Sequence, residues 1–251
     1  MTEQKTRFTT EGLVIKEMNV GESDRLVTLF TREYGIIRAF ASGAKTIKSK
    51  KGAATSLLTY ASFTILQKKG SLRIYEATPI SVFWGIGSDI ETLGICQYFC
   101  ELGFVFGEEN SPNTELLRLI LNSLHFITKE KRDIYLIKAI TELRTASLCG
   151  YAPNLIACED CGKFEDNIMY FNLSEGSLLC SDCNKRGEGI AVNKTVLSAM
   201  RHIIYSDFSK LYSFSVPSED AKYLSKLTQR YITHQTDYKF STLEFFNSIK
   251  E

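Results

Sequence analysis

Proline and long apolar runs are scarce in this chain. Its 251 residues include only four prolines, which argues against a long proline-rich linker. No apolar run approaches the roughly 18 residues that a membrane-spanning helix needs, so no membrane association is expected. The polar segment Met1–Thr10 lacks the apolar core of a secretory signal. Together these absences predict a cytoplasmic protein, in which thiols stay reduced.

Residues for catalysis are also sparse. The three histidines, His125, His202 and His234, each stand alone among residues of helical pattern. No Ser-His-Asp or Cys-His arrangement can be assembled from neighbouring sequence, and no glycine-rich phosphate loop is present. We therefore expect a protein that is not an enzyme.

Length, composition and charge describe a globular chain with two unlike parts. Apolar residues make up 44% and charged residues 24%, which is close to the globular average, and the length allows one large domain or two ordinary ones. Residues 1–85 hold 13 Lys or Arg and 7 Asp or Glu, whereas residues 86–251 hold 17 and 22. This asymmetry indicates an N-terminal part that meets a polyanion, although a net +6 also fits an ordinary surface.

Alternating apolar residues predict five short strands in the N-terminal part. Gly70 gives the last two strands a hairpin turn, and a longer insertion precedes the fourth. Five strands of this length suit a closed barrel of the OB type. The predicted strands are Thr9–Met18, Arg25–Thr31, Ile36–Ala41, Ser62–Lys68 and Arg73–Ala77.

Helical periodicity replaces the alternation from about residue 86. Asn113 or Thr114 can cap the second helix, and Gly150 ends the third. We expect an α+β chain, with a barrel domain at 1–80 and a helical domain at 81–251 that carries an insertion at about 155–187. The predicted helices are Asp89–Phe106, Asn113–Thr128, Asp133–Cys149, Thr195–Ser206, Ser218–Thr233 and Ser241–Ile249.

Four of the seven cysteines form two C-x2-C pairs in that insertion, Cys158 with Cys161 and Cys180 with Cys183. This spacing is typical of a tetrahedral zinc site, with a hairpin between the two pairs. Four thiolates close the coordination shell, so one zinc ion with a structural role is expected. A redox pair or unligated cysteines are the alternatives. Cys96, Cys100 and Cys149 lie on apolar helical faces and are expected to be core residues.

A lysine-rich loop precedes the fourth strand. Ala41–Thr55 contains Lys45, Lys48, Lys50 and Lys51 and no acidic residue. Lysine suits phosphate contact without base reading, so the loop is a candidate nucleic-acid contact, the alternative being a solvated loop that is basic by chance. Arg38, Lys68, Lys69 and Arg73 would extend the surface, and Tyr34, Phe40 and Tyr75 offer stacking faces. Phe40 and Phe63 suit the barrel core equally well.

Several runs resemble the RecO family of bacterial DNA repair proteins, and the resemblance spans almost the whole chain. The most specific are Gly21–Thr31 (GESDRLVTLFT) with Tyr34-Gly35, and Gly150–Leu155 (GYAPNL) leading into Cys158-x2-Cys161-Gly162. Glu11–Val14, Gly43–Lys45 with Lys48–Lys50, and Leu243–Phe245 are similar to further family segments.

The resemblance implies an OB domain, a helical domain with a zinc site, and a role as a recombination mediator of the RecF pathway. It implies annealing of single-stranded DNA, binding of single- and double-stranded DNA, and association with the nucleoid during repair. It also implies partnership with RecR and single-stranded DNA-binding protein for the loading of RecA. The family's DNA contacts carry over to Arg38, Lys45, Lys48, Lys50 and Lys51, and its zinc ligands to the four paired cysteines. The second part of the chain is net acidic, which does not fit a DNA-binding surface that continues from the first part onto the second.

Two other functions fit parts of the sequence. An RNA-binding protein of translation or transcription could combine an OB barrel with a zinc ribbon. A zinc hydrolase would need an open coordination position, which four sulfur ligands do not leave.

Overall fold

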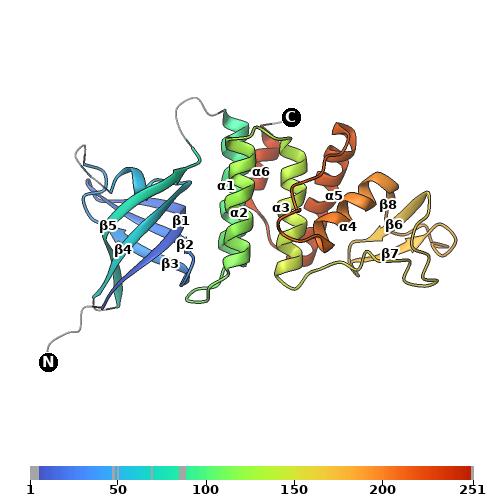
Figure 1. Ribbon diagram of the computed structural model, residues 1–251, viewed down its shortest axis with the longest axis horizontal. Helices are drawn as coiled ribbons and strands as arrows, with labels where there is room; N and C mark the ends of the chain where they lie inside the picture. The colour runs from blue at the N-terminus through green and yellow to red at the C-terminus, as the bar shows by residue number, and fades with distance from the viewer. Residues whose placement is uncertain (1–5, 47–48, 50, 69, 85–88, 250–251) are drawn as a thin grey trace. The chain divides into compact units, whose positions relative to one another are not determined.

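The N-terminal part is a closed five-stranded barrel (Figure 1). The structure is a computed structural model, and it describes residues 6–46, 49, 51–68, 70–84 and 89–249. The strand order β1-β2-β3-β5-β4, with β4 returning to β1, confirms the predicted OB-type barrel. The strands are β1 (Thr6–Val20), β2 (Asp24–Thr31), β3 (Gly35–Ala41), β4 (Thr59–Lys68) and β5 (Ser71–Val82).

Alternation along the strands fills the barrel interior. On β4, Ala61, Phe63 and Ile65 point inward and are fully buried, whereas the residues between them are partly exposed. Phe63 therefore occupies the core, as one of the two readings predicted. Phe40 lies outside this core cluster and is half-buried on β3, where it is the register partner of Arg73 on β5.

Three helices complete the first compact unit, which comprises residues 1–130 and 241–251. They are α1 (Ile90–Phe106), α2 (Thr114–Thr128) and α6 (Ser241–Ser248). Asp89 caps α1 by accepting the Thr92 N–H, and Asn113 caps α2 by accepting the Leu116 N–H. Cys96 and Cys100 are buried on α1, as predicted for core cysteines.

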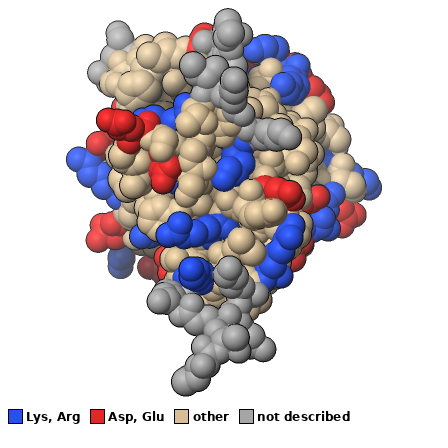
Figure 2. All heavy atoms as spheres, turned by 90° about the vertical axis from the view of Figure 1, so that its left-hand side faces the viewer, with Lys and Arg blue, Asp and Glu red and all other residues tan. Residues whose placement is uncertain are grey.

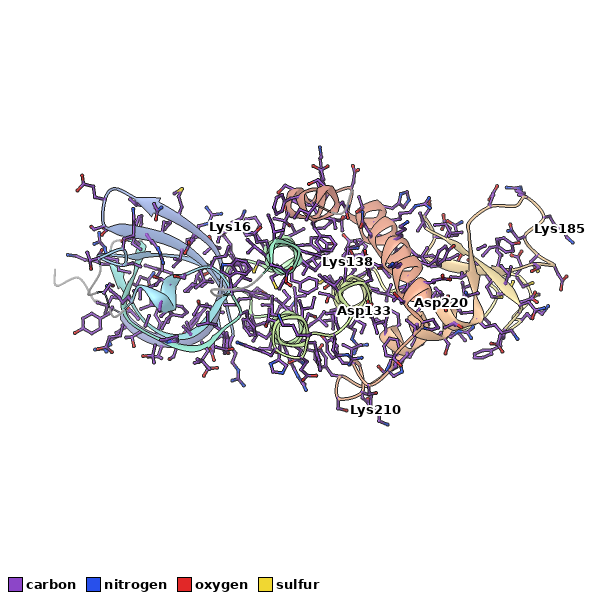
Figure 3. The ribbon with its side chains drawn as sticks, turned by 90° about the horizontal axis from the view of Figure 1, so that it is seen from above. Lys16, Asp133, Lys138, Lys185, Lys210 and Asp220 are labelled. Atoms are coloured by element: carbon purple, nitrogen blue, oxygen red, sulfur yellow. The ribbon has the colours of Figure 1, made fainter. Side chains whose placement is uncertain are left out.

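The second compact unit comprises residues 131–240. Its helices are α3 (Ile134–Leu148), α4 (Lys194–Tyr205) and α5 (Ser218–Thr236), and its sheet has the order β7-β6-β8. A buried ion pair within α3, Lys138 with Glu142 at 2.8 Å, contacts α5, because Lys138 also donates to the Ser225 carbonyl. Figure 3 shows Lys138 on the side of α3 that faces α5. The sheet strands are β6 (Ile168–Asn172), β7 (Ser177–Cys180) and β8 (Ile190–Asn193).

The predicted α+β class, the barrel and all six helices are confirmed, and the hairpin between the cysteine pairs is β6–β7. Strand β8 and the short 3-10 helix η1 (Ala53–Thr55) were not predicted. The predicted domain boundary at residue 80 remains a prediction. The compact units divide the chain at other positions, and α1, α2 and α6 belong to the same unit as the barrel. In the described part of the chain, none of the helices has the length and apolar character needed to span a bilayer.

Candidate metal centre and nucleic-acid interface

The two C-x2-C pairs come together in the second unit. Cys158 and Cys161 lie in the segment before β6, Cys180 ends β7, and Cys183 lies in the turn that follows. All four Sγ atoms lie within 4.8 Å of one another, and the Sγ atoms of Cys161 and Cys180 are 3.7 Å apart. Tetrahedral zinc with bonds of about 2.3 Å places its sulfurs about 3.8 Å apart. The cluster therefore has the size and donor set of a four-sulfur zinc site.

Backbone N–H groups favour the thiolate form of one cysteine, which is the form that binds a metal. Burial raises the pKa of the Cys158 thiol, but N–H groups of Cys180, Cys161 and Asp160 outweigh burial and bring it to about 6. The Cys180 N–H lies 3.3 Å from the Cys158 Sγ. The sulfurs of Cys161 and Cys180 instead raise the pKa of Cys183, because each sulfur in the group competes for the shared protons. A divalent metal would replace those protons and hold all four sulfurs as thiolates.

Arg201 on α4 binds the backbone on both sides of the first cysteine pair. Its guanidinium donates to the carbonyls of Leu155, Ile156 and Phe164, and it lies 4.0 Å from the centroid of the Phe164 ring. Three carbonyls from both sides of Cys158 and Cys161 are thus fixed by one side chain. The four sulfurs leave no coordination position for water, so the arrangement suits a structural metal.

On the barrel, part of the predicted basic surface gathers at the β1–β2 turn. The Lys45 N–H donates to the Ser23 carbonyl over 2.9 Å. Hydrogen bonds from the Gly43 N–H and the Ser23 hydroxyl lower the pKa of Asp24, and the charges of Lys51 and Arg73 lower it further. Lys51 also donates to the Ile74 carbonyl of β5 over 3.3 Å. Lys45 is thus joined to the turn through its backbone, and Lys51 and Arg73 lie close enough for their charges to act on Asp24.

The other predicted basic residues differ in setting. Arg38 on β3 is 58% exposed and lies 3.8 Å from Glu109, which neutralises part of its charge. Lys68 is exposed at the end of β4, beside the β4–β5 hairpin. Lys48, Lys50 and Lys69 lie outside the described residues. Figure 2 shows one face of the molecule, where Lys and Arg are scattered among Asp and Glu and several of the basic residues lie close together in the lower half.

Aromatic side chains accompany these cations. Tyr75 on β5 is 53% exposed, and the guanidinium of Arg7 lies 4.8 Å from its ring centroid. Tyr75 and Lys51 line one hollow of about 440 Å³, together with Glu76–Pro79. Tyr34 instead rests against Phe8, with ring centroids 4.5 Å apart. Sequence reasoning missed Arg7, whose outward position beside β5 follows only from the barrel's closure.

Comparison with known proteins decides the family. The family model "Recombination protein O N terminal" matches residues 4–83, and "Recombination protein O C terminal" matches residues 87–244. A protein named DNA repair protein RecO from Acetivibrio thermocellus is 33% identical over 241 residues, 96% of each chain. Another of that name from Alkaliphilus metalliredigens is 27% identical over 242 residues, 96% of this chain and 98% of its own. This chain belongs to the RecO family.

RecO membership gives the coarse function, that of a DNA repair protein. The two RecO models meet between residues 83 and 87, shortly after β5 ends and before α1 begins. The histidines of this RecO chain have polar contacts elsewhere: His125 with Glu130, His202 with the Lys210 carbonyl, and His234 with the Ser174 hydroxyl. None of these contacts is to a member of the cysteine cluster.

Proposed function

We propose that this RecO-family protein is a non-enzymatic recombination mediator of the bacterial cytoplasm, working at the nucleoid during repair. It binds and anneals single-stranded DNA. With RecR, it helps RecA load onto DNA coated with single-stranded DNA-binding protein. The observation that carries the DNA-binding part is the grouping of Lys45, Lys51 and Arg73 around one turn, beside the exposed ring of Tyr75.

The mechanism is electrostatic with a stacking contribution. Lysines at the loop neutralise phosphates of two strands, which lowers the repulsion between the strands and lets complementary bases pair. Tyr75 and the half-buried Phe40 offer faces on which unpaired bases stack without sequence preference. The guanidinium of Arg7 covers one face of the Tyr75 ring, and the other face can take a stacked base.

One zinc ion, held by Cys158, Cys161, Cys180 and Cys183, is part of the proposal. When bound, it supplies cross-linking of the segments around β6 and β7 and no catalytic chemistry. Arg201 holds the segments on both sides of the first cysteine pair against α4. The metal is therefore assigned to the stability of the second unit and the DNA contact to the barrel.

Annealing of two complementary oligonucleotides coated with single-stranded DNA-binding protein tests the proposal. The variant Lys45→Ala, Lys48→Ala, Lys50→Ala, Lys51→Ala is compared with wild type. A matched control replaces the exposed Lys185, Lys194, Lys210 and Lys226 of the second unit and loses the same charge. We expect annealing to fail in the loop variant alone. If about four phosphates are neutralised, log K should fall with log salt at a slope of roughly −3, and a salt-independent affinity would contradict the mechanism.

Competition between RNA and DNA of equal length tests the RNA-binding alternative. A DNA annealing protein that contacts phosphates and base faces should bind the two within a few-fold of each other or prefer DNA. A strong preference for RNA would indicate contacts to the 2′-hydroxyl and favour a role in translation or transcription.

A further inference from the structure

The β1–β2 turn holds the first end of the lysine-rich loop. Asp24 accepts the Gly43 N–H at Oδ1 over 2.8 Å, and its neighbour Ser23 accepts the Lys45 N–H at its carbonyl over 2.9 Å. The Ser23 hydroxyl donates to the same Asp24 oxygen over 3.0 Å. Both contacts fall immediately after β3 ends, so they fix the direction in which the chain leaves the barrel.

Arg25, the next residue, holds the other end. One guanidinium nitrogen donates to the Gly52 carbonyl over 3.1 Å and to the Ser56 hydroxyl over 3.0 Å, and it lies 3.4 Å from the Glu17 carboxylate. The Arg25 side chain is only 18% exposed. The Arg25 side chain therefore points into the fold and binds the segment where the loop returns to the barrel, whereas the Lys45 side chain is exposed.

The two ends of the loop meet between these contacts. A Cβ atom on Gly52 would lie 2.9 Å from the Ala44 carbonyl oxygen, so only glycine allows this approach. Ala44 and Ala54, on the two sides of the excursion, are both buried in the barrel core. We call this crossing of Gly43–Lys45 and Lys51–Gly52 the loop neck. From the neck, the Lys45 side chain is exposed, whereas Lys51 is half-buried and donates to the Ile74 carbonyl of β5.

We propose that Asp24 and Arg25 are positioning residues for nucleic-acid binding: they close the loop neck and thereby fix where Lys45 and Lys51 stand at the β1–β2 turn. This inference rests on the proposed function. Neither residue is itself a phosphate contact, because Asp24 carries the wrong charge and the Arg25 guanidinium is engaged with Gly52, Ser56 and Glu17. Their contribution is preorganisation, since a loop that is fixed before binding loses less conformational entropy when DNA arrives.

The sign of the charge change separates positioning from simple electrostatics. Asp24→Ala and Glu22→Ala each remove one negative charge from the same turn, and Glu22 is an exposed neighbour. If only charge matters, both variants bind a polyanion as well as wild type or better. If Asp24 positions the loop, Asp24→Ala weakens binding of a dT oligonucleotide by about threefold or more, whereas Glu22→Ala does not. Asp24→Asn keeps an acceptor oxygen and should stay close to wild type.

Arg25→Lys gives the complementary test, because it keeps the charge. A lysine ammonium is a strongly hydrated point charge on a flexible stem, so it holds the Gly52 and Ser56 acceptors less firmly than the rigid, planar guanidinium does, and the return of the loop is loosened. We expect Arg25→Lys to weaken DNA binding about as much as Arg25→Ala. Equal affinity of Arg25→Lys and wild type would show that the charge alone is needed and would overturn the role given to Arg25.

Hydrogen exchange at the Gly43 and Lys45 amides in the full chain reports the neck directly. Asp24→Ala should speed their exchange by about tenfold or more, whereas Glu22→Ala and Asp24→Asn leave it unchanged. Unchanged exchange in Asp24→Ala overturns the proposal.

A Lys45→Ala, Lys51→Ala variant separates failure of this inference from failure of the proposed function. If the neck opens in Asp24→Ala without weakening DNA binding, while the lysine variant binds poorly, positioning is wrong and the basic loop survives. If the lysine variant also binds like wild type, the loop is not a DNA contact, and both proposals fall.

Discussion

Gly35 joins the β2–β3 turn to the connection between α1 and α2. It has a φ of +60°, and a Cβ atom there would lie 2.3 Å from the carbonyl oxygens of both Glu108 and Ser111. The next residue, Ile36, donates its N–H to the Glu108 carbonyl over 2.9 Å. Because both obstacles are backbone atoms, no side-chain rearrangement can relieve the contact.

Gly35→Ala is therefore expected to destabilise the protein far more than backbone strain alone would. The matched control is Gly21→Ala: Gly21 has a φ of +59°, and a Cβ there meets nothing within 4 Å. The control should cost about 1 kcal/mol and Gly35→Ala at least about 2 kcal/mol more, as measured by urea unfolding. Equal losses in the two variants would show that the turn moves away from Glu108 and Ser111 at little cost.

At the scale of elements, a carboxylate of α1 holds the C-terminal helix α6. Glu101 is only 8% exposed and accepts the N–H groups of Ser241 and Thr242 over 3.1 and 2.9 Å, and both hydroxyls as well. A short helix has little stability of its own, so this contact and the buried Leu243 and Phe246 keep it in place.

Glu101→Gln replaces one acceptor oxygen with an NH2 group that faces donors. We expect a loss of about 1–3 kcal/mol, with faster hydrogen exchange concentrated in α6. The same change at the exposed Glu115 on α2 is the control and should leave α6 protected. Uniform exchange across the protein in Glu101→Gln would contradict a local attachment of α6.

Elements were predictable from the sequence where their signal is local. Four helices begin with a side-chain cap, such as Asp89 on α1 and Asn113 on α2, and β4 alternates regularly between buried and partly exposed residues. The helices and the barrel strands were therefore found within a few residues of most of their bounds. Strand β8 has four residues, too few for a period, and exists because it pairs with β6 about twenty residues earlier. Its signal is a tertiary contact, which local periodicity does not contain.

The candidate sites divide in the same way. The paired cysteines were recognisable because ligand spacing is written in the sequence, and the structure brings their sulfurs together. The contacts of Asp24 with Gly43 and Arg25 with Gly52 span 19 and 27 residues and were not foreseen. Arg25 shows the limit of charge counting, since it is basic, lies beside the loop, and is turned inward.

At the scale of the whole molecule, the cysteine cluster and the proposed DNA contact lie in different compact units. The four cysteines belong to residues 131–240, whereas the β1–β2 turn and the loop neck belong to the unit that contains the barrel, α1, α2 and α6. If the units are stabilised separately, loss of the metal should damage only one of them.

Cys161→Ser tests this separation. Serine is a poor zinc ligand, so we expect loss of zinc by elemental analysis and a lower melting transition for the second unit, with faster exchange in β6, β7 and α4. Exchange in the barrel, α1 and α2, and the affinity for single-stranded DNA, should remain at wild-type values. Cys149→Ser, outside the cluster, should keep both metal and stability.

Because a structural metal contributes folding energy only where its ligands lie, a Cys161→Ser protein that keeps zinc and its melting curve would refute the zinc assignment. Loss of DNA affinity together with zinc would instead show that the two units depend on each other.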